Sequence, residues 1–385
     1  MNQSIWIWQQ PGWPHFSWQA EPLAPLLRAC TRAQGRLLGM LDGLGKDAET
    51  HISLNALLEN IMCSSAIEGE QVDEEALRST LKRHLGQSGT GDTTPRLCHE
   101  GLAQLLLDAI NKHTQTLDLQ RLCSWHEWLF QHGSDLLNDP LRVGMLRGDD
   151  PMQVVSGSAS HLTVHYEAPP RANLEKELAD FLTWFEDSRH NSSLDPLLRA
   201  GITHFWFVTL HPFEDGNGRI TRILTDLALA QSDRQAIRFY AMSASIFDDR
   251  KNYYQILEAS QKSNLDITNW LEWFFHTLLV SLEQALTQID QALAKTRFWQ
   301  AHQMDSLPLE QAIVLNRLLD GVESDFGDSI SAAQYQSAAQ VSKATATRHL
   351  SDLLEKGYLR RMPGGGRSTR YQINQPSGTS LATQE

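Results

Sequence analysis

The chain has 385 residues, a formal net charge of −13 and a hydrophobic content of 41%. Because this length exceeds one typical domain, we expect two or three compact units, each with its own core. The acidic balance argues against nonspecific nucleic-acid binding by the whole chain, although it leaves room for a basic module at one end. There is no apolar run of about eighteen residues and no signal-peptide pattern at Met1. We therefore expect no membrane segment and a cytoplasmic location.

The cysteines indicate neither a disulfide framework nor a zinc knuckle. They lie far apart, without CxxC spacing, at Cys30, Cys63, Cys98 and Cys123. We expect them to be buried thiols.

The start of the chain is rich in tryptophan and proline. Trp6 and Trp8 alternate with isoleucines as in a strand, and Pro11 and Pro14 then interrupt regular structure. We predict an extended arm that packs onto a later helix, because large aromatic residues near a chain end commonly hold that end in place. A sugar- or peptide-binding aromatic patch is the alternative interpretation.

Two helices are expected next, and the second leads to a notable carboxylate. Apolar spacing predicts a helix from about Leu23 and another over 52–62. Gly69 is a typical helix stop. Glu68 therefore falls near a helix C-terminus, where the helix dipole disfavours a carboxylate unless a cation neutralises it. An arginine elsewhere in the chain could be that cation; otherwise Glu68 is an ordinary surface residue.

The middle of the chain predicts a loop, two helices and a hairpin. The segment 86–95 is rich in glycine, serine and threonine, so we predict a surface loop and end the N-terminal region, 1–95, there. Helical patterns cover 102–110 and 119–130. The HEWLF sequence from His126 lacks the second histidine of the HExxH zinc pattern, which favours a structural role. Two β-rich runs flanking SGSAS then predict a hairpin over about 150–168.

The most informative stretch is HPFEDGNGRITR, from His211 to Arg222. Helical patterns on both sides place a glycine-rich turn at a helix N-terminus, where backbone N–H groups and the helix dipole form an anion site. Asn217 is expected to share the unusual dihedrals of the glycines. Arg219 and Arg222 share a helical face and could neutralise the outer phosphates of a triphosphate. Asp215 is a hard oxygen ligand suited to magnesium.

A different module is predicted after a long helix that runs from Ile267 to about Phe298. Helices over 309–319, 331–340 and 342–355, followed by strands over 358–362 and 369–373, predict a winged helix-turn-helix at 305–374. Its surplus of basic residues, with Thr345, Thr347 and Arg348 on or near the third helix, fits contacts to duplex DNA. Docking of a protein is an equal alternative. The tail, 375–385, is predicted to be disordered.

Two of these stretches resemble motifs of the Fic (filamentation induced by cAMP) family. The stretch from His211 to Arg222 matches its signature, HPFx(D/E)GNGRxxR, at every specified position. Ser64, Glu68 and Gly69 match its inhibitory motif, (S/T)xxxE(G/N). The resemblance covers most of the chain up to about residue 300. It implies a mainly α fold with a Fic helical core at 96–300, a β-hairpin flap, an N-terminal helical and extended arm, and the C-terminal winged helix-turn-helix.

The resemblance implies a protein adenylyltransferase, which transfers AMP from ATP to a Ser, Thr or Tyr hydroxyl of a target protein and releases pyrophosphate. His211 would be the general base. Asp215 would hold Mg²⁺, with Mn²⁺ as an alternative. The implied nucleotide-binding residues are Phe213, whose ring we expect to face the core, Gly216, Asn217, Gly218, Arg219, Arg222, Tyr254 and Gln261.

Two further roles are implied by the resemblance. Glu68, from the motif that includes Ser64, would pair with Arg222 and prevent a productive pose of the γ-phosphate. The flap residues Val164, His165 and Tyr166 would align the target segment through main-chain hydrogen bonds.

Three alternatives stay open at the level of sequence. The same fold could transfer another nucleotide or phosphocholine, or remove AMP from a modified target. The chain could instead be a nucleotide-sensing regulator that acts on DNA through the winged helix. A homodimer is a further expectation, because the tryptophan-rich arm and the hairpin edge both favour self-association.

Overall fold

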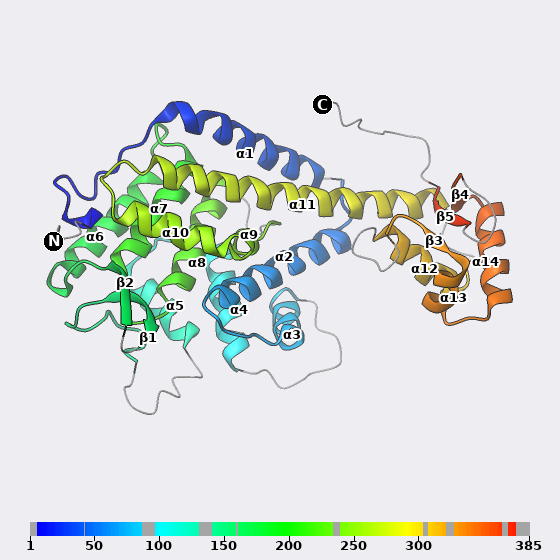
Figure 1. Cartoon of the computed structure of the whole chain (residues 1–385), viewed down its shortest axis with the longest axis horizontal. Helices are drawn as coiled ribbons and strands as arrows, with labels where there is room; N and C mark the ends of the chain where they lie inside the picture. Colours follow the sequence, from blue (N-terminus) through cyan, green and yellow to red (C-terminus); the bar gives the residue numbers. More distant parts are fainter. Residues whose placement is uncertain are drawn as a thin grey trace. The chain divides into compact units, whose positions relative to one another are not determined.

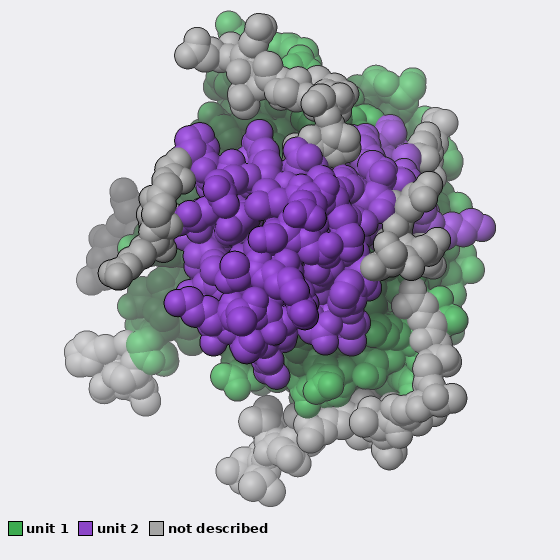
Figure 2. Space-filling view, turned by 90° about the vertical axis from the view of Figure 1, so that its right-hand side faces the viewer, with its two compact units in different colours: residues 1–37, 50–285 green, residues 38–49, 286–385 purple. Residues whose placement is uncertain are grey.

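The computed structural model describes residues 6–41, 43–86, 97–130, 141–158, 161–233, 239–302, 307–320, 327–363 and 369–374. The chain divides into two compact units, 1–37 with 50–285 and 38–49 with 286–385 (Figure 2). The predicted linker after Gly86 and the predicted tail, 375–385, lie outside the described residues. The domain boundaries drawn from motifs stay predictions.

The fold is mainly helical, as predicted, with one β-hairpin and a small C-terminal sheet (Figure 1). The helices and strands that begin before residue 286 are α1 (Ala20–Leu41), α2 (Lys46–Ile67), α3 (Glu74–His84), α4 (Leu97–Asn111), α5 (Leu119–Leu129), β1 (Gln153–Ser158), β2 (His161–Glu167), α6 (Arg171–Ser188), α7 (Pro196–Leu210), α8 (Asn217–Asp233), α9 (Met242–Asp248), α10 (Arg250–Gln261) and α11 (Thr268–His302).

Helix α7 is the centre of the first unit. It is buried on every side from Leu197 to Leu210, which fits a helix made mostly of apolar residues. Asp195 caps its start by accepting a hydrogen bond from the Leu197 N–H at 2.8 Å, and Pro196 occupies the first turn. α7 packs against α6 and most extensively against α8, which in turn packs on α4. The turn between α7 and α8 is therefore held by two buried helices.

The N-terminal arm differs in part from the prediction. The expected strand alternation around Trp6 and Trp8 is wrong, because Ile7–Gln9 forms a 3-10 turn (η1) closed by a 2.9 Å hydrogen bond from the Gln9 N–H to the Trp6 carbonyl. Side-chain contacts decide its course: the Trp6 ring meets Tyr166 edge-on at 5.4 Å between centroids. Packing onto a later helix is confirmed, since Trp13 lies edge-on to Trp206 of α7.

The predicted hairpin is confirmed as an antiparallel pair of β1 and β2. Ser156 pairs with Thr163, and the register shifts between Val154 and Val155. The base of the hairpin is anchored by Tyr166, whose buried hydroxyl donates a 2.7 Å hydrogen bond to the Thr209 carbonyl at the end of α7. Its strands otherwise expose valines to solvent.

The second unit contains α12 (Leu309–Leu319), β3 (Ile330–Ser331), α13 (Ala332–Ala339), α14 (Lys343–Glu355), β4 (Leu359–Arg361) and β5 (Arg370–Ile373). The strand order is β3-β5-β4, around a core that includes Tyr335 and Leu350. The predicted helix bounds agree within a residue, because Ser331 and Ser342 cap α13 and α14 locally. The two-residue strand β3 was not predicted, since it is too short to show periodicity.

Among the described residues, no helix has both the length and the apolar character needed to cross a bilayer.

Candidate active site

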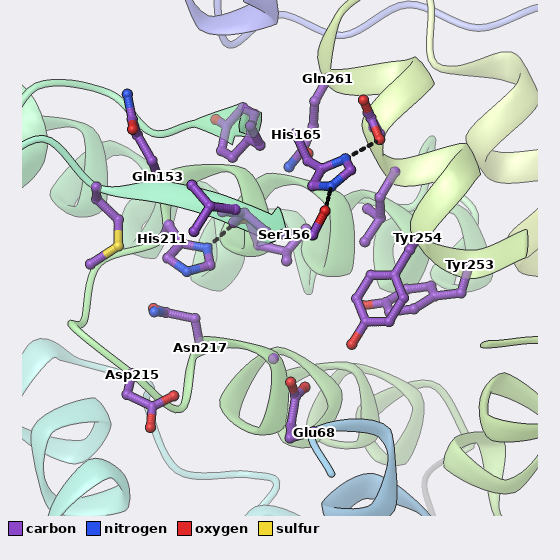
Figure 3. Close-up of a pocket in the computed structure, with 18 of the residues that line it drawn as sticks. Glu68, Gln153, Ser156, His165, His211, Asp215, Asn217, Tyr253, Tyr254 and Gln261 are labelled. Atoms are coloured by element: carbon purple, nitrogen blue, oxygen red, sulfur yellow. Dashed lines mark hydrogen bonds and ion pairs between the residues drawn. The ribbon is translucent and has the colours of Figure 1, made fainter. Parts of the chain in front are cut away.

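A cavity of about 890 Å³ opens between the turn after α7, the hairpin and α10 (Figure 3). The cavity is large enough for a small organic ligand. The predicted site residues that line it are Glu68, His165, Tyr166, His211, Asp215, Gly216, Asn217, Gly218, Tyr254 and Gln261. The tertiary structure thus gathers the cavity lining from four distant parts of the sequence.

His211 ends α7 in a left-handed conformation, with φ of 49°. Its ring Nδ1 lies 3.2 Å from the Val208 carbonyl, which can only accept, so Nδ1 carries the proton and Nε2 keeps its lone pair. Burial, together with the smaller effect of the Arg147 charge, lowers the pKa of His211 to about 4. The imidazole is therefore neutral at physiological pH, as a general base must be.

Arg147 holds the backbone of this turn and was not found from the sequence. Its Nε donates a 2.9 Å hydrogen bond to the His211 carbonyl, and its own backbone N–H donates to Pro212 at 3.0 Å. Its Nη2 donates to the Pro169 carbonyl at 2.5 Å. Arg147 is only 2% exposed, so hydrogen bonds to these carbonyls compensate for the burial of its charge. No local pattern marks a residue that acts 64 positions away.

Asn217 closes the turn through its side chain. Its Oδ1 accepts from the Phe213 N–H at 3.0 Å, and its Nδ2 donates to the Phe213 carbonyl at 2.8 Å. The expectation that Asn217 takes unusual dihedrals is wrong, because it is the first residue of α8, and positive φ within the turn falls on His211 and Gly216. Gly216 takes φ of 77°, which glycine adopts without strain.

Phe213 lies in the core, as expected, with a ring that is completely buried. It stacks on His126 with centroids 4.3 Å apart. The His126 Nδ1 accepts from the Gly144 N–H at 2.8 Å, so its Nε2–H is the donor to the Asp215 carbonyl at 3.2 Å. Burial lowers the pKa of His126, which keeps this ring neutral. Phe213 therefore supports the turn from the core side and is not part of the cavity lining.

Asp215 presents its carboxylate to the cavity and to solvent, with 64% of the side chain exposed. Its Oδ1 accepts from the Gly216 N–H at 2.6 Å, and its Oδ2 lies 3.9 Å from Nη2 of Arg219. Within the described ranges, no group of three or more His, Cys, Asp or Glu residues is arranged to hold a metal ion. A single accessible carboxylate suits Mg²⁺, which completes its shell with substrate phosphates and water.

Glu68 and Ser64 meet Arg222. The Arg222 Nη2 pairs with Oε1 of Glu68 at 2.8 Å and also donates to the Ser64 carbonyl at 2.8 Å, while Nε donates to the Ser64 Oγ at 2.8 Å. Arg222 is 2% exposed, so removal of its carboxylate partner would leave a buried charge unpaired. A Cβ at Gly218 would collide with the Glu68 carboxylate, so glycine is required for this close approach.

Arg219 takes a different direction from Arg222, although the two share a helical face. It pairs with Glu70, and its guanidinium lies 5.1 Å from the centroid of the Phe130 ring. Glu70 was not found from the sequence, because a carboxylate after a helix stop has no distinctive pattern. Both arginines line a small separate cavity of about 20 Å³ beside Ser64 rather than the large one.

The remaining predicted residues divide between the cavity wall and its support. The Tyr254 ring is 40% exposed at the wall, whereas Gln261 is buried and donates to the Thr209 hydroxyl at 3.3 Å. On the hairpin, His165 lines the cavity and Val164 lies outside the lining. Tyr166 is 2% exposed, so its side chain anchors the hairpin and is not free to meet a target.

These features define a class of protein: a helical fold in which a buried helix ends in a neutral histidine and a glycine-containing turn leads into the next helix. Residues 116–229 match the Fic/DOC family model, and residues 6–87 match a domain of unknown function, DUF4172. The chain therefore carries a Fic/DOC family domain over 116–229, with DUF4172 on its N-terminal side.

Solved structures share the fold. A Fic family protein from Desulfovibrio desulfuricans G20 matches with a TM-score of 0.50 and 20% identity, over 92% of this chain and 98% of that one. Fic-1 from C. elegans matches with a TM-score of 0.51 and 19% identity, over 72% of this chain and 76% of that one. At these identities the likeness concerns the fold alone.

Curated relatives include protein adenylyltransferases. The chain is 34% identical over 94 residues to protein adenylyltransferase fic-1 of Caenorhabditis briggsae, which is 24% of this chain and 16% of that protein. It is 24% identical over 266 residues to protein adenylyltransferase Fic of Drosophila willistoni, which is 66% of this chain and 49% of that protein. The chain thus matches half or less of the length of these relatives.

Proposed function

We propose that this protein is a protein adenylyltransferase restrained by its own Glu68. It would transfer AMP from ATP to a Ser, Thr or Tyr hydroxyl of a target protein and release pyrophosphate. The observation that carries the proposal is the neutral His211, whose unprotonated Nε2 lies at a cavity whose wall includes the glycine-rich turn.

The residues of the turn suit this reaction. His211 would take the proton of the target hydroxyl, which is a poor nucleophile without a base. The N–H groups at the start of α8 would stabilise the phosphate oxygens as charge shifts at the α-phosphorus. Asp215 would hold Mg²⁺, which when bound neutralises phosphate charge. In this role, Phe213 and Asn217 support the turn.

Glu68 would restrain the reaction by occupying Arg222. The Arg222 guanidinium is buried, its Nε and Nη2 bond to Ser64 and Glu68, and its charge is paired with Glu68, so it would not be available to the γ-phosphate. Nucleotide would then bind without the contact that aligns its phosphate chain for attack. Glu68→Gly would leave Arg222 held by Ser64 but available to phosphate, and activity would rise.

The test compares wild type and Glu68→Gly with Mg²⁺ and ATP labelled at either the α- or the γ-phosphate. Label should enter protein only from the α-position, and more strongly in the Glu68→Gly variant. Glu49→Gly, at another α2 glutamate, is the matched control and should behave as wild type. Label from the γ-position would indicate phosphorylation. Equal labelling of wild type and Glu68→Gly would contradict the proposal that Glu68 restrains the reaction. Competition by other nucleotides would test which nucleotide the protein prefers.

A second candidate function is DNA binding by the second unit. Its helices α13 and α14 are joined by a short turn at Gln340, and α14 exposes Lys343, Thr347 and Arg348 to solvent. Exposed arginines on β4 add to this basic face. The arrangement is typical of a winged helix. Salt-dependent binding to duplex DNA, lost in Arg348→Ala, is the expected result, and absence of binding at low salt would contradict it.

A further inference from the structure

Three side chains from separate elements form a hydrogen-bonded line on the hairpin side of the cavity (Figure 3). The Ser156 Oγ on β1 lies 2.6 Å from Nε2 of His165 on β2. The His165 Nδ1 lies 2.8 Å from a carboxylate oxygen of Glu258 on α10. Thr163 pairs with Ser156 across the hairpin, and His165, two residues further along β2, points to the same face.

The direction of these hydrogen bonds follows from the carboxylate. Lys262 first of all, and then His165, hold the pKa of Glu258 below its usual range, so the carboxylate is an acceptor. The His165 Nδ1 must therefore be its donor; in the unprotonated ring, the Nε2 lone pair is then left to accept the Ser156 hydroxyl proton. The order is therefore a hydroxyl on Ser156, a base on His165 and a carboxylate on Glu258 that orients the base. This order of groups can activate a nucleophile.

Stability alone gives little reason for this arrangement. The His165 and Glu258 side chains are 33% and 35% exposed, and polar side-chain contacts with this exposure contribute little to folding. The hairpin already has its anchor in the buried Tyr166. Ser156 is itself exposed, and it lines the same cavity as His211, Asp215 and the glycine-rich turn.

We propose that Ser156 is an AMP acceptor within the same molecule and that His165 is its general base. This proposal rests on the proposed adenylyltransferase function, because ATP bound in the cavity is the donor. The Ser156 Oγ attacks the α-phosphorus, and its proton passes to Nε2 of His165. The bond from the α-phosphorus to the bridging oxygen breaks, and pyrophosphate leaves. The product is an AMP phosphodiester on Ser156, on the strand that would meet the target.

The first experiment locates the modification. Glu68→Gly protein is incubated with Mg²⁺ and ATP, digested, and analysed by mass spectrometry for an adenylyl group on the peptide that contains Ser156. Ser156→Ala should lose this modification, and Ser156→Thr should keep it at the same position. Thr163→Val, which removes the facing hydroxyl, should keep the Ser156 modification. The rate per molecule should not change with protein dilution, since the acceptor lies in the same chain.

The second experiment assigns the base. His165→Gln should lower Ser156 modification by about 10²-fold or more, the usual cost of losing a general base. His211→Ala should lower modification of other proteins far more than modification of Ser156. Glu258→Gln should lower Ser156 modification, and Glu258→Asp should restore part of it, because a carboxylate only accepts and so fixes the Nδ1–H form, whereas the Gln amide can also donate. Equal losses at Ser156 in His165→Gln and in its control, Thr163→Val, would overturn the role of His165.

Failure of this proposal and failure of the proposed function give different results. If Glu68→Gly modifies other proteins from α-labelled ATP and the Ser156 peptide stays unmodified, Ser156 is not an acceptor and the adenylyltransferase stands. A rate that rises with protein concentration would also overturn the proposal, since modification would then pass between molecules. If no protein carries the α-label in any variant, both proposals fall together.

Discussion

The turn from His211 to Gly218 and the hairpin of β1 and β2 line the same cavity, yet they are built in opposite ways. The turn joins two buried helices and is held by side chains that bond its backbone, above all Arg147 and Asn217. The hairpin exposes its valines and is tied at its base by Tyr166. Under the proposed function, the group that would move a proton is held rigidly, whereas the surface that would meet protein targets is left accessible.

The largest expected effect comes from removing the base on the rigid side. His211→Ala should lower AMP transfer to other proteins by about 10²- to 10⁴-fold, the usual contribution of a general base. Nucleotide binding should persist, since the N–H groups of the turn do not depend on the ring. Transfer is measured with α-labelled ATP and binding by calorimetry. A variant that keeps the wild-type transfer rate would rule out His211 as the base.

The pH dependence of AMP transfer also tests the role of His211 as the general base. His211 acts in its unprotonated form, and burial lowers its pKa to about 4. The rate should therefore stay level as pH falls from neutral and should drop about tenfold per pH unit only below about 4. Single-turnover rates of Glu68→Gly, with circular dichroism at each pH as the folding control, test this. A drop centred near the ordinary histidine value would contradict the burial argument.

The support beneath the turn is tested by Arg147. Arg147→Met keeps much of the volume but leaves the His211 and Pro169 carbonyls without donors, at a cost of about 1–3 kcal/mol for each buried group. Thermal unfolding should shift downward, and kcat should fall more than nucleotide affinity. Arg171→Met, which removes a more exposed neighbouring arginine, is the control. Equal shifts of the unfolding temperature in both variants would contradict the inference that Arg147 holds the turn.

The smallest effect is expected on the hairpin side. Tyr166→Phe removes the hydrogen bond to the Thr209 carbonyl, which typically contributes about 0.5–1.5 kcal/mol. Because the ring still packs on Trp6, the fold should persist while the hairpin loosens. We expect a higher KM for a target protein with little change in kcat. A large fall in kcat with unchanged KM would show that the hairpin shapes the turn itself.

Local signals account for what was predicted well. The caps at Ser331 and Ser342 and the apolar periods around them are contained within a few residues, so α13 and α14 were predicted almost to the residue. The stretch from His211 to Arg222 carries its own geometry for the same reason: a helix end, a glycine with positive φ and a helix start follow one another in the chain.

Sequence patterns predicted the helical class, the hairpin, the helices and strands of the C-terminal module and the residue types in the turn after α7. Long-range contacts in the folded protein decide which groups meet at that turn. Glu70 reaches Arg219, Arg147 reaches the His211 carbonyl, and Glu258 orients His165, all across long separations in the chain. The Trp6 region coils where alternation predicted a strand, because its side chains find partners on β2. The physical reason is the same in each case: periodicity and capping act over one or two turns, whereas burial and charge pairing act between elements that only folding brings together.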